Sequence, residues 1–314
     1  MTLAFQDWFG PIQREYLETF IKSGGAAVRF VVADEANVGP MSDAITQVAA
    51  SSGMSVIEID TAATKLHMLQ FVVYAIAARL DWDGLLQARL ERLVVEAGYQ
   101  WPELEHAPSL QSLADYNGVV PALLRITMQK QITRAVWTDA ALAQDFRYAA
   151  IALLDAQLTG DEDGLRGPVL EWFRGELRGL TLIRSTGIGA RIGRHNARAI
   201  LVSLCHFLQS CNHSSLLILL DLRRLLRERR EVAEGITYTP AAVMDCYEVL
   251  RQIIDDTEHF EGTVVVALAD HRLVNDDVPK RALTSYDALK MRVWDDVRPQ
   301  GRDNPLSPLV SLTR

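Results

Sequence analysis

The stretch Val28-Arg29-Phe30-Val31-Val32, followed by Ala33-Asp34-Glu35-Ala36-Asn37-Val38-Gly39-Pro40, decides which fold is expected for this chain. The first five residues, four of them apolar, predict a short buried strand. Residues 41–52 can form a helix, so residues 33–40 are expected to be a loop between strand and helix. Ser55 to Ile59 predicts a second strand, which ends in Asp60. This order indicates a βαβ unit with parallel strands and a right-handed crossover.

A strand, an eight-residue loop and a helix form the layout of a phosphate-binding loop, G-x-x-x-x-G-K-[ST]. Laid on residues 33–40 without a gap, the pattern puts Ala33 and Val38 at the two glycine positions. Gly39 then stands at the lysine, and Pro40 at the hydroxyl that would bind magnesium. Glycines let backbone N–H groups approach a phosphate, the lysine neutralises it and the hydroxyl ligates the metal. The layout therefore predicts a nucleotide-binding fold, whereas the residues argue against ATP hydrolysis.

A second stretch fits the magnesium-binding motif of such folds, because the apolar run Leu216 to Leu220 ends in Asp221. Leu222 follows, where a glutamate would act as general base. Two interpretations stay open: Asp221 holds magnesium, or it caps the structure that comes after a buried strand. Residues 263–268 predict another buried strand, which ends near Asp270.

Two weaker signals have plain structural interpretations as well. His271 and Arg272 follow the strand at 263–268, where ATPases carry sensor residues, but a polar loop pair is the simpler interpretation. Residues 187–193 have the spacing G-x-G-x-x-x-G, one residue longer than the dinucleotide-binding pattern, and no acidic partner follows. We interpret residues 187–193 as a flexible turn.

The rest of the chain is mostly helical by pattern. An amphipathic helix is predicted at 5–22, and helical periodicity dominates residues 66–177. Further helices are predicted at 196–210, from 222 to about 230, at 240–257 with Thr239 as N-cap, and at 286–297, and the tail 302–314 has three turn signals. The expected organisation is an N-terminal helix and βαβ unit (1–65), a helical insertion (66–180), and the second half of the α/β core (181–314).

Composition excludes several classes of protein. The chain of 314 residues has 49% hydrophobic residues and a net charge of −8, which disfavours a bulk electrostatic grip on nucleic acid. No apolar run reaches the ~18 residues of a membrane span, and the N-terminus carries no secretory signal. Three cysteines without a C-x-x-C pair suit free thiols in a cytoplasmic protein. The spacing of Cys205, His206, Cys211 and His213 fits no standard zinc site.

A local basic patch is nevertheless predicted, because five arginines crowd into eight residues: Arg223, Arg224, Arg227, Arg229 and Arg230. The simpler interpretation is a solvated helix with an apolar stripe. The alternative is a surface for an acidic partner or for DNA, with Arg223, Arg224, Arg227 and Arg230 as the contacting residues.

Taken together, these segments resemble the ATP-binding P-loop proteins of BREX-type phage-resistance systems, a branch of the AAA-like ATPases. The resemblance runs from about residue 17 to the end. Its most specific parts are Arg194-His195-Asn196-Ala197-Arg198, residues 247–256, Ser285-Tyr286 and Asn304-Pro305. The family's two phosphate motifs would fall on residues 33–40 and 217–221, and the chain departs from both.

The resemblance implies an α/β P-loop core with a mainly parallel sheet and a large helical insertion. We expect a degenerate ATPase without bound cofactor, which regulates or scaffolds a defence complex through protein partners; an intact ATPase relative is one candidate partner. The alternative is a switch that binds ATP or ADP weakly. Its contacts would be Asp34, Asn37 and Gly39, with Asp221 on magnesium and Arg194 replacing the lysine.

Overall fold

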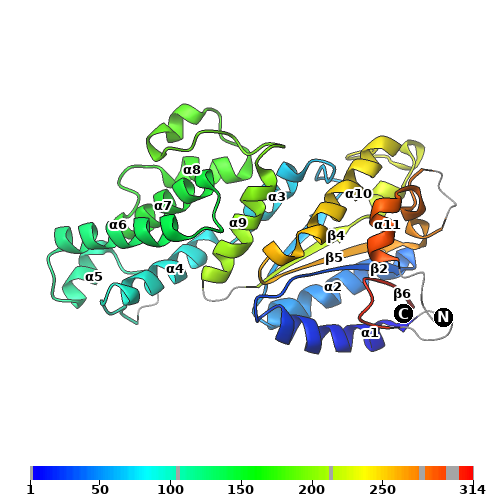
Figure 1. Cartoon of the computed structure of the whole chain (residues 1–314), viewed down its shortest axis with the longest axis horizontal. Helices are drawn as coiled ribbons and strands as arrows, with labels where there is room; N and C mark the ends of the chain where they lie inside the picture. Colours follow the sequence, from blue (N-terminus) through cyan, green and yellow to red (C-terminus); the bar gives the residue numbers. More distant parts are fainter. Residues whose placement is uncertain (1–2, 104–106, 212–214, 276–279, 295–303, 314) are drawn as a thin grey trace. The chain divides into compact units, whose positions relative to one another are not determined.

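Figure 1 presents the computed structural model of the protein, which describes residues 3–103, 107–211, 215–275, 280–294 and 304–313. By its internal contacts the chain divides into two compact units. Unit 1 consists of Met1–Ala75 and His213–Arg314, and unit 2 is Ile76–Asn212. Unit 1 holds the sheet, and unit 2 is helical.

Unit 1 is built from alternating strands and helices, with short 3-10 turns between them. Its elements are β1 (Leu3–Ala4), α1 (Phe5–Pro11), the π-helix η1 (Ile12–Phe20), β2 (Ala27–Ala33), α2 (Glu35–Ser51), β3 (Ser55–Asp60), α3 (Leu69–Ala77, which runs into unit 2), β4 (Leu216–Asp221), η3 (Arg223–Leu226), η4 (Arg229–Glu231), α10 (Pro240–Asp255), η5 (Thr257–His259), β5 (Thr263–Asp270), η6 (His271–Leu273), η7 (Leu283–Ser285), α11 (Asp287–Val293) and β6 (Leu309–Thr313).

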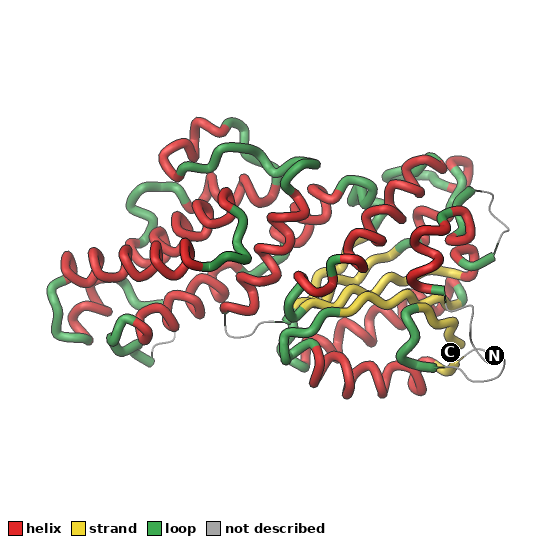
Figure 2. Tube along the Cα trace, viewed as in Figure 1, coloured by secondary structure: helices red, strands yellow, loops and turns green. Residues whose placement is uncertain are grey.

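The strands form one sheet in the order β1-β6-β2-β5-β4-β3, and every pair is parallel. All residues of β2 and β5 are buried, as expected for strands covered on both faces. Figures 1 and 2 show α1 and α2 on one face and α10 and α11 on the other. The prediction of an α/β fold with a parallel sheet is therefore confirmed.

Strand β6 was not anticipated from the turn-rich tail. It pairs with β2, where Phe30 faces Leu309, and the Phe30 N–H donates to the Pro308 carbonyl at 2.7 Å. Val310 and Leu312 are buried. The short strand is stable because β2 supplies hydrogen-bond partners and the core covers its apolar side chains.

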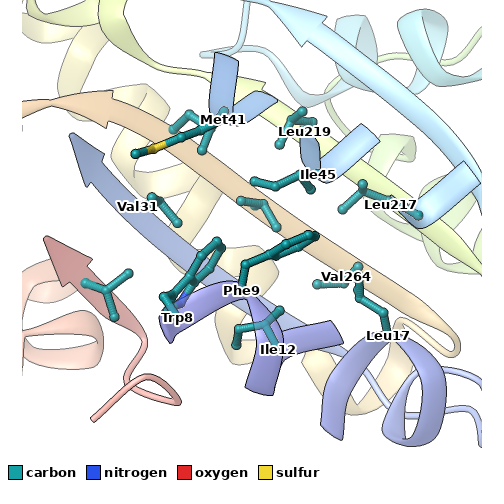
Figure 3. Packing of buried hydrophobic residues seen from close by; sticks show 14 of the residues in the cluster. Trp8, Phe9, Ile12, Leu17, Val31, Met41, Ile45, Leu217, Leu219 and Val264 are labelled. Carbon is teal, nitrogen blue, oxygen red and sulfur yellow. The ribbon is translucent and has the colours of Figure 1, made fainter. Parts of the chain in front are cut away.

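One face of the sheet carries a large apolar cluster, part of which is drawn in Figure 3. Trp8, Phe9 and Ile12 from α1 and η1 pack with Met41 and Ile45 of α2 over the strands. Each fully buried side chain of this size stabilises the fold by roughly 1.5–3 kcal/mol. This packing holds α1, η1 and α2 against the strands at whose ends the candidate site lies.

On the opposite face, two ion pairs lie within α10 and a third joins α10 to α11. Arg251 binds Glu248 at 2.6 Å and also pairs with Asp255, while Arg292 of α11 pairs with Asp255. Tyr286 donates its hydroxyl to Glu248. The Arg251 hydrogen bond lowers the pKa of Glu248 to about 2. Residues 247–256 and Ser285-Tyr286, two parts of the family resemblance, therefore contact each other.

Unit 2 contains α4 (Trp82–Glu96), α5 (Leu110–Tyr116), α6 (Pro121–Thr138), α7 (Gln144–Thr159), α8 (Arg166–Arg174), η2 (Leu180–Thr186) and α9 (Ala197–Ser210). Its core includes a series of aromatic contacts among mostly aliphatic side chains. Phe146 meets Phe173 at 5.4 Å and Phe207 at 5.7 Å, and Trp82 meets Phe173 at 4.8 Å between ring centroids. Because Phe207 lies on α9, the structure groups α9 with the helical unit, although the sequence division placed residues 181–314 in the second half of the α/β core.

Candidate functional site

Four carboxylates follow the ends of neighbouring parallel strands in unit 1. Asp34 comes after β2, and Asp60, Asp221 and Asp270 end β3, β4 and β5. Asp60 pairs in register with Asp221, and Ala33 with Asp270. Strands β3, β4 and β5 lie on one side of β2 in the sheet, and β6 lies on the other side. The strand order therefore reverses at β2, which makes β2 a topological switch point. Ligands of open α/β sheets bind outside the strand ends at such a point. We call this region the carboxyl edge.

The connection from β2 to α2 is one residue long. Helix α2 begins at Glu35, directly after Asp34, so the eight-residue loop predicted at 33–40 is wrong. Val38 and Met41 are buried three residues apart on the side of α2 that faces the sheet, and this burial extends the helix toward β2. Pro40 lies inside the helix without ending it.

Gly39 and Asn37, two predicted nucleotide contacts, are helical residues of α2. A Cβ atom added to Gly39 would meet nothing within 4 Å, so no close approach of another group explains this glycine. The Asn37 N–H donates to the Asp34 carbonyl at 2.8 Å. With the helix beginning at residue 35, no loop of backbone N–H groups is available here to wrap a phosphate.

Asp221 is bound by an arginine two residues later. Its Oδ1 accepts from the Arg223 backbone N–H and Nε, both at 3.0 Å, and its Oδ2 accepts from Arg223 Nη2 at 2.6 Å. This hydrogen bonding raises the pKa of Arg223. The backbone contact is the capping role considered as the alternative to magnesium binding. A metal ion on Asp221 would have to displace the guanidinium.

Asp270 and Arg272 repeat the same arrangement at the end of β5. Asp270 Oδ1 accepts from the Arg272 backbone N–H at 2.9 Å and from Nε at 3.0 Å, and Oδ2 accepts from Nη2 at 2.6 Å. The pKa of Arg272 rises because of this bonding. The Asp270 side chain is 6% exposed, so its charge depends on this arginine for compensation.

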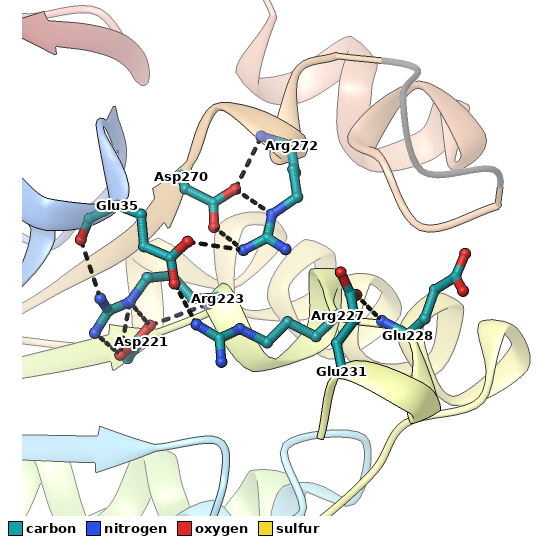
Figure 4. Close-up of polar contacts among 8 residues, drawn as sticks. All are labelled: Glu35, Asp221, Arg223, Arg227, Glu228, Glu231, Asp270 and Arg272. Atoms are coloured by element: carbon teal, nitrogen blue, oxygen red, sulfur yellow. Dashed lines mark hydrogen bonds and ion pairs between the residues drawn. The ribbon is translucent and has the colours of Figure 1, made fainter. Parts of the chain in front are cut away.

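Glu35 links the two aspartate–arginine pairs, as Figure 4 shows. Its carboxylate accepts from Arg227 and, at 3.5 Å, from Arg272 Nη2. Its backbone carbonyl accepts from Arg223 Nη1 at 3.3 Å. Nearby, His271 Nε2 lies 3.2 Å from Asp34 Oδ1. Three arginines thus converge on the first residue of α2, each matched by a carboxylate of the protein itself.

The residues of the carboxyl edge do not fit a magnesium–triphosphate group. Glu35 places a carboxylate at the start of α2, where a phosphate would bind in a working site. The arginines that could neutralise phosphates already bind Asp221, Asp270 and Glu35. We therefore derive no catalytic step through ATP.

Sequence reasoning weighed Arg272 only as half of a sensor pair and did not anticipate that Glu35 binds arginines. A signal was present, because Asp221-Leu222-Arg223 and Asp270-His271-Arg272 both read D-x-R at the end of a buried strand. At this spacing, the aspartate carboxylate accepts from the backbone N–H of the arginine two residues later, and the guanidinium of the same arginine can bind that carboxylate as well.

The predicted basic helix from 222 to about 230 is wrong. The segment forms two 3-10 turns, η3 and η4, with Arg227 extended between them. The segment does not form a continuous helix because Arg223 and Arg227 bind carboxylates of the carboxyl edge. Arg224 Nε donates to the Ile236 carbonyl at 2.9 Å, and Arg230 pairs with Glu228 at 2.8 Å. DNA contact through these arginines stays a prediction.

Other predicted features lie elsewhere. Arg194 belongs to unit 2, just before α9, and its role as a substitute lysine stays a prediction. Thr239 caps α10 as predicted, accepting from the Ala242 N–H at 3.2 Å. Residues 295–297 of the expected C-terminal helix, and His213 of the cysteine–histidine group, lie outside the described residues. Across the part of the chain that is described, no group of three His, Cys, Asp or Glu side chains is placed to hold a metal ion.

Comparison with known proteins identifies a family. The family model described as BREX system ATP-binding protein BrxC/D matches residues 114–314, more than half of the chain. Residues 1–113, which include β2 and α2, lie outside the match. No curated protein and no solved structure matches this chain. Among the described residues, no helix combines the length and apolar character that crossing a bilayer requires.

Proposed function

Because the chain belongs to the BREX system ATP-binding BrxC/D family, we propose that it is a non-hydrolysing, ATPase-like subunit of an anti-phage defence system. The family supports the defence role. The observation that carries the rest of the proposal is the carboxyl edge, where α2 begins one residue after β2 and Glu35 binds Arg227 and Arg272. A subunit of this kind acts through protein contacts.

A candidate contact surface lies on the helical unit. Tyr116, Val120, Leu123 and Ile126 are 52–65% exposed and fall within eleven residues of α5, α6 and the turn between them. Exposed apolar side chains gathered in this way mark protein contacts more often than scattered ones do. We propose an intact ATPase relative of the same defence system as the partner.

Calorimetric titration with magnesium and ATP, run beside a phosphate-release assay, tests the loss of nucleotide chemistry. We expect neither heat of binding nor turnover. Binding without turnover would replace the proposal with the nucleotide-binding switch. Turnover that disappears in Asp221→Asn would overturn it.

Co-purification with the ATP-hydrolysing relative tests the partner. Leu123→Asp combined with Ile126→Asp should abolish it, whereas the exposed control Lys130→Glu on the same helix should leave it intact. Equal recovery of both variants would remove this surface from the proposal.

A further inference from the structure

A second arginine-rich segment lies in unit 2, between the end of α8 and the first turn of α9 in Figure 1. Residues 178–198 contain five arginines and no lysine, aspartate or glutamate. Their formal charge is +5 in a chain of net −8, so the remaining residues sum to −8 − 5 = −13. The cationic side chains are all exposed: Arg178, Arg184, Arg191, Arg194, His195 and Arg198.

The Arg178–Arg198 segment differs from the carboxyl edge in how its charges are matched. There, Arg223 and Arg272 each bind an aspartate. Here, within the described residues, Arg178, Arg184 and Arg194 form no ion pair with a carboxylate. Like charges gathered without internal partners repel one another, so an anionic partner would relieve that repulsion.

Backbone contacts fix the shape of this surface. Arg191 Nη2 donates to the Arg178 carbonyl at 2.6 Å, which brings two arginines of distant sequence position together. The Gly193 N–H donates to Asn196 Oδ1 at 2.7 Å, and Asn196 Nδ2 donates to the Arg191 carbonyl at 3.2 Å. The resulting turn carries Arg194 and His195 at its exposed side. The arginines are thus presented by an ordered turn.

Contact with α8 anchors the middle of the segment. Trp172, which is 1% exposed, donates its indole N–H to the Ala190 carbonyl at 2.8 Å. Ile183, Ile188 and Ile192 are buried, so apolar side chains alternate with the exposed arginines. The segment therefore turns its cationic side chains outward because its isoleucines are held in the core of unit 2.

We propose that the Arg178–Arg198 segment binds the phosphate backbone of double-stranded DNA. A guanidinium group binds a phosphate through two parallel hydrogen bonds, which explains the use of arginine alone. Phosphate contacts position a protein on a duplex and need no pocket. The segment contains no phenylalanine, tyrosine or tryptophan, so it lacks the large rings on which single-stranded bases stack and which anchor many protein interfaces.

Fluorescence anisotropy with a labelled duplex tests this binding in the full-length protein. The variant Arg178→Gln/Arg184→Gln/Arg194→Gln removes three of the proposed phosphate contacts. Because each contact contributes about 0.9 to the slope of log K against log salt, that slope should fall by about 2.7. Affinity at about 0.1 M salt should drop by more than about tenfold. Melting temperatures of wild type and variant establish that both are folded.

The matched control is Arg14→Gln/Lys22→Gln/Lys280→Gln, which removes three positive charges from exposed positions of unit 1. It should keep the wild-type slope. Equal losses in both variants, or no wild-type binding at about 50 mM salt, would overturn the proposal. If poly-glutamate competes as effectively as unlabelled DNA at equal charge concentration, the surface binds acidic proteins, and the DNA proposal is overturned as well.

Discussion

Removing the carboxylate of Asp270 is the sharpest test of the carboxyl edge as a closed set of ion pairs. In Asp270→Ala, Arg272 would lose the three hydrogen bonds it makes to Asp270, two of them from its guanidinium, and would keep only Glu35 at 3.5 Å. Breaking one side of a buried pair costs about 3–5 kcal/mol. The Arg272 side chain is 25% exposed and can regain water, so we expect the lower end, about 3 kcal/mol.

Urea unfolding, read by linear extrapolation, measures this loss. At roughly 2–4 °C per kcal/mol for 150–250 residues, the melting temperature of unit 1 should fall by about 6–12 °C. Asp34→Ala is the control, because its side chain is 68% exposed and, among the described residues, forms an ion pair with His271 alone, and it should cost less than about 0.5 kcal/mol. The same loss of stability in both variants would refute the reasoning.

A double mutant separates pairing from packing. Arg272→Ala leaves Asp270 buried and without its arginine, whereas Asp270→Ala/Arg272→Ala removes both charges. The double mutant should therefore be more stable than Arg272→Ala alone, since the uncompensated buried charge is the costly state. Simple additivity of the two single losses would contradict an ion pair between these residues.

Three further outcomes follow from the geometry. The pKa of Glu248 is lowered to about 2, so this carboxylate stabilises the fold fully above its ordinary pKa and loses that effect as the pH falls from about 4.5 toward 2. With solvent screening, the acid-dependent part of the unfolding free energy is about 1–2 kcal/mol. Glu248→Gln should remove this part, as measured by urea unfolding at a series of pH values between about 5 and 3. Gly39→Ala should raise the melting temperature, since alanine is better than glycine in a helix interior by about 1 kcal/mol and has room there, whereas Gly187→Ala should lower it, because φ is +94°. A lower melting temperature for Gly39→Ala would contradict the unobstructed helical position of that glycine. Thr239→Ala should lower the free energy of unfolding by about 1 kcal/mol, because α10 loses its N-cap. If urea unfolding shows that Thr239→Ser keeps the stability that Thr239→Ala loses, the hydroxyl is the stabilising group.

Much of the fold could be predicted from local sequence. Four strands, three of them buried, the helices of residues 66–177 and the cap at Thr239 are read from apolar periodicity and cap residues, which act between near neighbours. The family was also recognisable, and the match to residues 114–314 includes the most specific parts of the resemblance, though not its first phosphate motif at 33–40.

The carboxyl edge could not be predicted in the same way. The pattern at 33–40 is compatible with a loop, and only the burial of Val38 and Met41 against the sheet makes it a helix. The arginines of residues 223–230 look like one face of a helix until their partners are placed, because Glu35 lies 192 residues from Arg227 along the chain.

The sequence by itself determined that this chain is an α/β protein with buried parallel strands, a helical insertion and no intact phosphate-binding residues. Only the tertiary structure decided that β6 joins β2, that α2 begins at Glu35, and that the arginines close on carboxylates at the strand ends. The division has a physical reason. Periodicity and caps act over a few residues, whereas strand pairing and ion pairing depend on which distant segments the folded core brings together.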